Sequence, residues 1–125
     1  MPPKPRKEVV THLADETEFR GLVGTESDTR LHIVDVYAGW SGPCQQIVPT
    51  FKGLQISIDC FDERVSIVQI EHSLVAEVAE LAVSSKPRFL FFKEGVLLQQ
   101  IEGCQAPEIL KAINTHLPPL ANDDE

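Results

Sequence analysis

The residues with the clearest chemical potential form one short motif, which reads Trp40-Ser41-Gly42-Pro43-Cys44. In a dithiol redox loop two residues separate a pair of cysteines, and the thiolate of the first cysteine attacks a disulfide sulfur. Ser41 occupies that attacking position here. A serine hydroxyl is a far weaker acid than a thiol and forms no stable mixed disulfide, and the loop holds no histidine to act as its base. The motif therefore predicts that dithiol exchange is lost.

The motif lies between a predicted strand and a predicted helix. Residues 31–37 form a mostly apolar run typical of a buried strand, and a helix is expected from about Cys44 to Cys60. A strand, a tight Gly-Pro turn and a helix N-terminus would then form one unit. Because a helix N-terminus favours an anion or a partner's carbonyl group, the loop could act as a binding surface without catalysis.

This arrangement resembles the thioredoxin family, and further positions carry the resemblance. Asp35 stands where thioredoxins bury an acid, and Pro49 matches the family's helix-kinking proline. Lys86-Pro87-Arg88, with the apolar run after it, resembles the stretch around the family's cis-proline, and Gly103 matches the glycine that ends the last strand. The match covers roughly Val9 to Leu117. It implies an α/β thioredoxin fold, with a central mixed five-stranded sheet flanked by helices on both faces.

The pattern of apolar residues agrees with that fold. The predicted strands are Val9–Leu13, Leu31–Tyr37, Val65–Ile70, Arg88–Lys93 and Val96–Glu102, the last two forming a hairpin across Glu94-Gly95. The other predicted helices are Thr17–Val23, with Asp15 as its cap, Leu74–Val83 and Pro107–His116. We expect one domain over residues 8–118, between a basic proline-rich tail (1–7) and an acidic tail (119–125).

Three further positions differ from the family pattern. Gln69 falls where the family has a lysine near the buried acid, so Asp35 is either a remnant or an acid that burial keeps neutral. Lys86 replaces an apolar or small residue before the proline, and Arg88 stands where threonine is common. A cis bond at Lys86-Pro87 is implied by the resemblance alone. The two charges are either solvated or part of a partner-binding rim. The changes at Lys86 and Gln69 argue against a serine engineered into an ordinary thioredoxin.

The chain has three cysteines. Cys44 corresponds to the family's resolving position, where it is either a buried thiol that behaves as a small hydrophobe or a single redox group. Cys104 follows Gly103 and by the resemblance lies on the same face as the motif, so it either pairs with or replaces the missing cysteine, or is idle. Cys60, at the far end of the predicted long helix, is expected to be in the core or inert.

Composition excludes several classes of function. The net charge of −8 over 125 residues argues against a nucleic-acid surface. No apolar run reaches the ~20 residues of a membrane span, and no signal core follows the basic start. Three cysteines without framework spacing suit a reducing compartment, so we expect the protein in the cytosol. The four histidines lie on separate elements, and we expect no metal and no cofactor.

Within the family, the segment from Leu74 to Lys93 resembles two groups. These are the thioredoxin domains fused to nucleoside diphosphate kinases and the thioredoxin-like light chains of axonemal outer-arm dynein. The resemblance implies a redox-inactive or redox-impaired structural subunit, with a dynein heavy chain or another axonemal subunit as its partner in a cilium or flagellum. The candidate partner-binding residues are Trp40, Gly42, Pro43, Lys86, Pro87, Arg88, Gly103 and Cys104. The alternative is a monothiol oxidoreductase or redox sensor that uses Cys44, with or without Cys104.

Overall fold

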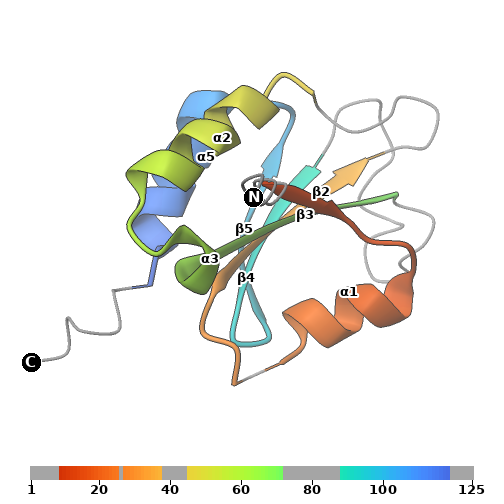
Figure 1. Cartoon of the computed structure of the whole chain (residues 1–125). Coiled ribbons are helices and arrows are strands. Elements are labelled where there is room, and N and C mark those ends of the chain that lie inside the picture. Colours follow the sequence, from red (N-terminus) through yellow and green to blue (C-terminus); the bar gives the residue numbers. More distant parts are fainter. Residues whose placement is uncertain (1–8, 26, 38–44, 72–87, 119–125) are drawn as a thin grey trace, which may run out of the picture.

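A computed structural model describes residues 9–25, 27–37, 45–71 and 88–118 (Figure 1). The elements in chain order are β1 (Val10–His12), α1 (Glu16–Val23), β2 (Leu31–Tyr37), α2 (Val48–Ser57), α3 (Phe61–Arg64), β3 (Val65–Glu71), β4 (Arg88–Lys93), β5 (Val96–Glu102) and α5 (Ala106–His116). The predicted helix Leu74–Val83, the motif at residues 40–44, and Lys86 and Pro87 lie outside the described residues.

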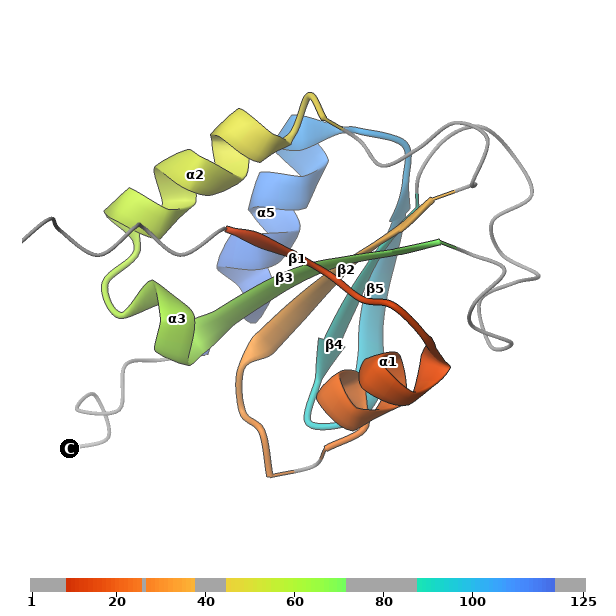
Figure 2. The same cartoon turned by 45° about the vertical axis from the view of Figure 1, so that its right-hand side comes forward.

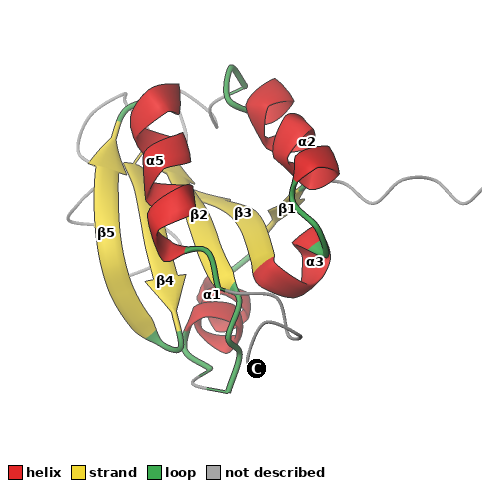
Figure 3. Ribbon diagram, turned by 90° about the vertical axis from the view of Figure 1, so that its left-hand side faces the viewer, coloured by secondary structure: helices red, strands yellow, loops and turns green. Residues whose placement is uncertain are grey.

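The strands form one mixed sheet in the order β1-β3-β2-β4-β5. β2 lies at its centre, paired in parallel with β3 and antiparallel with β4, while β1 pairs in parallel with β3 and β5 pairs antiparallel with β4. α2 and α5 cover one face of the sheet, and α1 lies on the opposite face (Figures 2 and 3). The sequence-based expectation of a central mixed five-stranded sheet between helices is confirmed.

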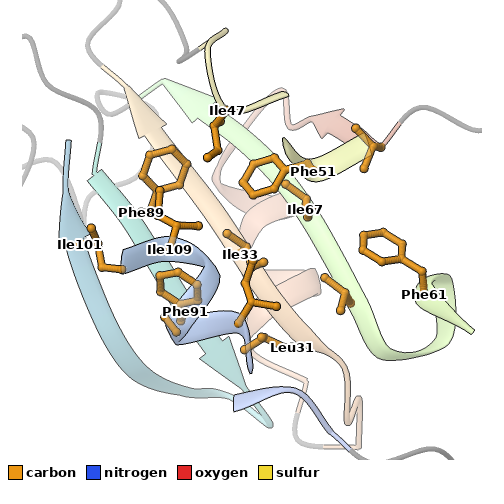
Figure 4. Packing of buried hydrophobic residues seen from close by; sticks show 14 residues of the cluster. Leu31, Ile33, Ile47, Phe51, Phe61, Ile67, Phe89, Phe91, Ile101 and Ile109 are labelled. Atoms are coloured by element: carbon orange, nitrogen blue, oxygen red, sulfur yellow. The ribbon is translucent and has the colours of Figure 1, made fainter. Parts of the chain in front are cut away.

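Alternating side chains of the strands build a core on each face of the sheet. On one face, Leu31 and Ile33 of β2 pack with the helices α2 and α5 (Figure 4). In this cluster the rings of Phe51, from α2, and Phe89, from β4, meet edge to face with their centroids 6.5 Å apart. On the other face, Val34 packs with residues of α1. The first cluster holds α2, the helix that follows the motif in sequence, against the sheet.

The predicted helix from Cys44 to Cys60 is wrong in its extent. α2 begins at Val48 and ends at Ser57, because Ile58 turns to an extended conformation and packs against the core. Cys60 then takes a left-handed conformation with φ 55° and precedes the short helix α3. Its thiol is exposed, which excludes the core position and leaves the alternative of an inert thiol. Pro49 lies in the first turn of α2, where the missing N–H removes no helical hydrogen bond.

The boundaries of the other described elements lie within one residue of the predicted ones, and local signals explain them. The side chain of Asp15 accepts a hydrogen bond from the backbone N–H of Glu18 at 2.9 Å and caps α1. Glu94 and Gly95 join β4 to β5 with φ values of 53° and 83°, as a two-residue hairpin of the favoured twist requires. The predicted hairpin is therefore confirmed, and its turn sets where β5 begins.

Candidate functional site

The candidate site residues that the structure describes lie at one end of the sheet. There the carboxyl end of β2 meets that of β3, where Tyr37 pairs with Glu71, and the amino end of β4, where Arg88 pairs with Val36. Arg88 is in turn opposite Glu102 at the carboxyl end of β5. The motif follows Tyr37 in the sequence, and Lys86-Pro87 precedes Arg88. We therefore define the motif-end surface by Tyr37, Glu71, Arg88, Glu102, Gly103 and Cys104. Asp35 and Gln69 are buried at the same end of the sheet.

Asp35 is buried at this end, with 2% of its surface exposed. It alternates with Leu31 and Ile33 along β2, which places its side chain on the face covered by α2 and α5. Its register neighbour on β3 is Gln69, which is also buried. A glutamine brings no positive charge beside the carboxylate. The lysine that the family resemblance implies near the buried acid has no counterpart at this position.

Tyr37 and His12 link β2 to β1 at the same end. The Tyr37 hydroxyl and Nε2 of His12 are hydrogen-bonded at 2.9 Å. Burial raises the pKa of Tyr37 above its usual value of 10, and the negative charges of Glu71 and Asp35 raise that pKa further. The phenol therefore stays protonated at neutral pH and acts as a hydrogen-bonding group, not as a base. The sequence analysis did not identify this pair.

Arg88 forms an ion pair across the hairpin. Its guanidinium Nη2 lies 3.0 Å from Oε2 of Glu102, and the side chains are 21% and 49% exposed. Arg88 is therefore a half-buried cation held in place by the neighbouring strand. An exposed pair of this kind contributes at most about 1 kcal/mol to stability. Its main consequence is to fix an exposed carboxylate and a guanidinium at the motif-end surface.

Gly103 and Cys104 connect β5 to α5. Gly103 has φ 86°, in the left-handed region that favours glycine, and so turns the chain away from the sheet. Cys104 follows it, half-buried and packed against the α2/α5 core, two residues before α5 begins. Its sulfur is disulfide-bonded.

The fold, the strand order and the residues gathered at this end agree with a match to the family model for Thioredoxin, which spans residues 9–115. The chain belongs to the thioredoxin family. It is 30% identical over 104 residues to the dynein 14 kDa light chain of the flagellar outer arm from Chlamydomonas reinhardtii, covering 83% of this chain and 78% of that one. It is 36% identical over 86 residues to thioredoxin Asp f 29 from Aspergillus fumigatus, covering 68% and 76%.

Solved thioredoxin structures share the fold. The thioredoxin NaTrxh from Nicotiana alata superposes with a TM-score of 0.70 over 94% of this chain and 100% of that one, at 21% identity. At this level of identity the likeness establishes the architecture. Within the part of the chain that the structure describes, no cluster of three or more metal-ligating side chains is present. No described helix is long and apolar enough to cross a bilayer.

A second polar group lies at the opposite end of β2 from the motif, and the sequence analysis did not identify it. Arg30 donates to both carboxylate oxygens of Asp28, at 3.0 and 2.7 Å, and this pairing lowers the pKa of Asp28 from 3.8 to about 2. His32 is buried beside them, with 1% of its surface exposed. Its Nε2 lies 3.3 Å from Oδ2 of Asp28 but outside hydrogen-bond geometry, and neither ring nitrogen has a hydrogen-bond partner among the described residues.

Because His32 is buried, we expect the free energy of unfolding to fall when the pH is lowered below about 6.5. Burial lowers its pKa below 6.5, and the charge of Asp28 offsets this only in part. Below pH 6.5 the imidazole is protonated in the unfolded chain but stays neutral in the folded chain. The free energy of unfolding therefore falls by up to about 1.4 kcal/mol per pH unit. His32→Leu should remove this contribution and, by replacing an unsatisfied buried imidazole, should not destabilise the protein at pH 7.5.

Urea unfolding of the wild type and His32→Leu at pH 7.5, 6.5 and 5.5 measures this difference. His12→Gln is the matched control, because His12 is an exposed histidine on the same sheet and its replacement leaves the His32 imidazole in place. The control should keep the wild-type slope between pH 6.5 and 5.5. Equal slopes in the wild type and His32→Leu would contradict the assignment to His32.

Proposed function

We propose that this protein is a redox-impaired member of the thioredoxin family that acts as a binding or structural subunit of a larger complex. The observation that carries the proposal is Ser41 at the position of the attacking cysteine. Without the first sulfur, no mixed disulfide forms at that position, so the usual turnover on protein disulfides is lost. Gln69 beside the buried Asp35 supports the same conclusion, because it removes a charge that would assist proton transfer.

The partner we propose is a protein of the axonemal outer dynein arm, such as a dynein heavy chain, with the cytoplasm and the flagellar or ciliary axoneme as the sites of action. The support is the 30% identity, over 83% of this chain, to a light chain whose name places it in a flagellar outer arm. Thioredoxins match this chain as well, so our preference for a subunit over an enzyme rests on the serine.

The surface we propose for the partner is the motif-end surface, extended by Trp40, Gly42, Pro43, Lys86 and Pro87. Arg88 is the best-placed anchor among the described residues. It is held by Glu102 at 3.0 Å, so a partner that binds it does not have to order a free side chain. Arginine is also over-represented among residues that dominate interface energies. We therefore expect partner recognition to depend on Arg88.

Affinity purification from flagellated or ciliated source cells tests the proposal, with and without reductant. Wild-type protein should recover an outer-arm dynein heavy chain in stoichiometric amount, and reductant should not release it. Arg88→Gln should lower the apparent affinity by about tenfold or more. Arg20→Gln is the matched control, because Arg20 is likewise paired with a glutamate, Glu16, but lies on α1. Absence of a heavy chain, or its release by reductant, would contradict a structural subunit.

The second candidate function is thiol redox chemistry through cysteines other than the usual pair. One observation favours it, which is the disulfide bond of Cys104. This chemistry is compatible with a subunit role, since a disulfide within a structural protein can respond to redox conditions without turning over substrate.

A further inference from the structure

Cys104 is disulfide-bonded in a structure that holds a single chain, and Cys60 is free. The chain has three cysteines. We infer that the bonding partner of Cys104 is Cys44, and that this disulfide is a reversible redox site which replaces the missing pair of the motif. The inference goes beyond the proposed subunit role, because it assigns a chemical state to the protein itself.

The surroundings of Cys104 suit a thiol that reacts reversibly. It lies two residues before α5, whose amino terminus stabilises a nearby thiolate. Glu102 is two residues earlier, and its carboxylate is paired with Arg88 at 3.0 Å, which weakens its repulsion of a thiolate. Cys104 is half-buried, so small thiol reagents reach it more readily than protein disulfides do.

The chemistry requires an external oxidant, and a small-molecule disulfide such as oxidised glutathione serves. The Cys104 thiolate attacks one glutathione sulfur, forms a mixed disulfide and releases one glutathione thiolate. The Cys44 thiolate then attacks the Cys104 sulfur and releases the second glutathione. The two protein thiols lose two electrons and two protons, and one glutathione disulfide becomes two thiols. The reverse sequence, with excess reduced glutathione, restores both protein thiols.

Tryptic mapping decides the pairing directly, because cleavage after lysine and arginine puts each cysteine in its own peptide. Cys44 lies in residues 31–52, Cys60 in 53–64 and Cys104 in 94–111. The full chain is equilibrated with glutathione buffers of different redox ratio, quenched with acid, alkylated and digested. After oxidation we expect the 31–52 peptide linked to the 94–111 peptide, with Cys60 alkylated. Reduced buffer should abolish the link and alkylate all three cysteines.

Single cysteine-to-serine variants identify which sulfurs form the link. Cys60→Ser is the matched control and should keep the link. Cys104→Ser should lose it, whereas Cys44→Ser should accumulate one glutathione on Cys104, because the second step is blocked. A link that involves Cys60, a link only between two chains, or full alkylation in oxidising buffer would overturn the inference. The map on wild-type protein requires no partner, so its failure is distinguishable from failure of the dynein purification.

Discussion

Replacing Phe89 with alanine is expected to lower the free energy of unfolding by about 3–5 kcal/mol. Phe89 is fully buried on β4, between the central strand β2 and β5, and its ring meets Phe51 of α2 edge to face. Truncation removes this apolar area and leaves a cavity beside Phe51, which lies next to Phe89 in the cluster (Figure 4). Because domains of this kind are stable by about 5–15 kcal/mol, the variant would keep only part of its stability.

Urea unfolding monitored by circular dichroism measures the loss. Leu98→Ala, on the edge strand β5 and 41% exposed, is the matched control and should change stability by less than about 0.5 kcal/mol. Adding Phe51→Ala to both backgrounds completes a double-mutant cycle, in which the ring contact should contribute a coupling of about 0.5–1.5 kcal/mol. A loss below about 1.5 kcal/mol for Phe89→Ala would contradict the packing of β4 against α2.

The sequence predicts the sheet well for a physical reason. Each strand carries a run of apolar or alternating residues, and the turn Glu94-Gly95 admits the positive φ values that a tight hairpin requires. The helix after the motif is harder to predict. Its apolar residues continue past Ser57. However, Ile58 packs against the core in an extended conformation after the helix ends, and Ile56 stays 72% exposed. Tertiary packing, which periodicity does not encode, therefore decides where α2 ends.

The pairing of Arg88 with Glu102 at the motif-end surface depends on a register shift in the hairpin that the sequence pattern does not predict. A regular two-residue hairpin that pairs Lys93 with Val96 would place Arg88 opposite Ile101. An irregularity between Phe91 and Phe92 shifts the register by one residue and brings Arg88 opposite Glu102 instead. The ion pair follows from that shift. Similarly, the contact between His32 and Asp28 depends on the path of the chain before β2, which no local motif specifies.

Restoring the missing sulfur should produce the largest change in activity. Ser41→Cys is expected to raise the rate of insulin-disulfide reduction, driven by dithiothreitol, by roughly two orders of magnitude or more, from a wild-type rate at the uncatalysed background. The reason is that a thiol forms the mixed disulfide a hydroxyl cannot form, and Cys44 can then resolve it. The other departures from the family pattern, Gln69 and Lys86, are left unchanged by this substitution.

Two controls separate the contributions to that gain. Ser41→Ala should stay at the background rate, which shows that removing the hydroxyl is not what matters. Combining Ser41→Cys with Cys104→Ser removes the thiol that we infer to compete for Cys44, and should raise the rate further. If wild-type protein already matched Ser41→Cys, the redox-impaired proposal would fail. If Ser41→Cys stayed at background, the pairing of Asp35 with a neutral glutamine would become the dominant defect, because proton transfer at Cys44 would then limit exchange.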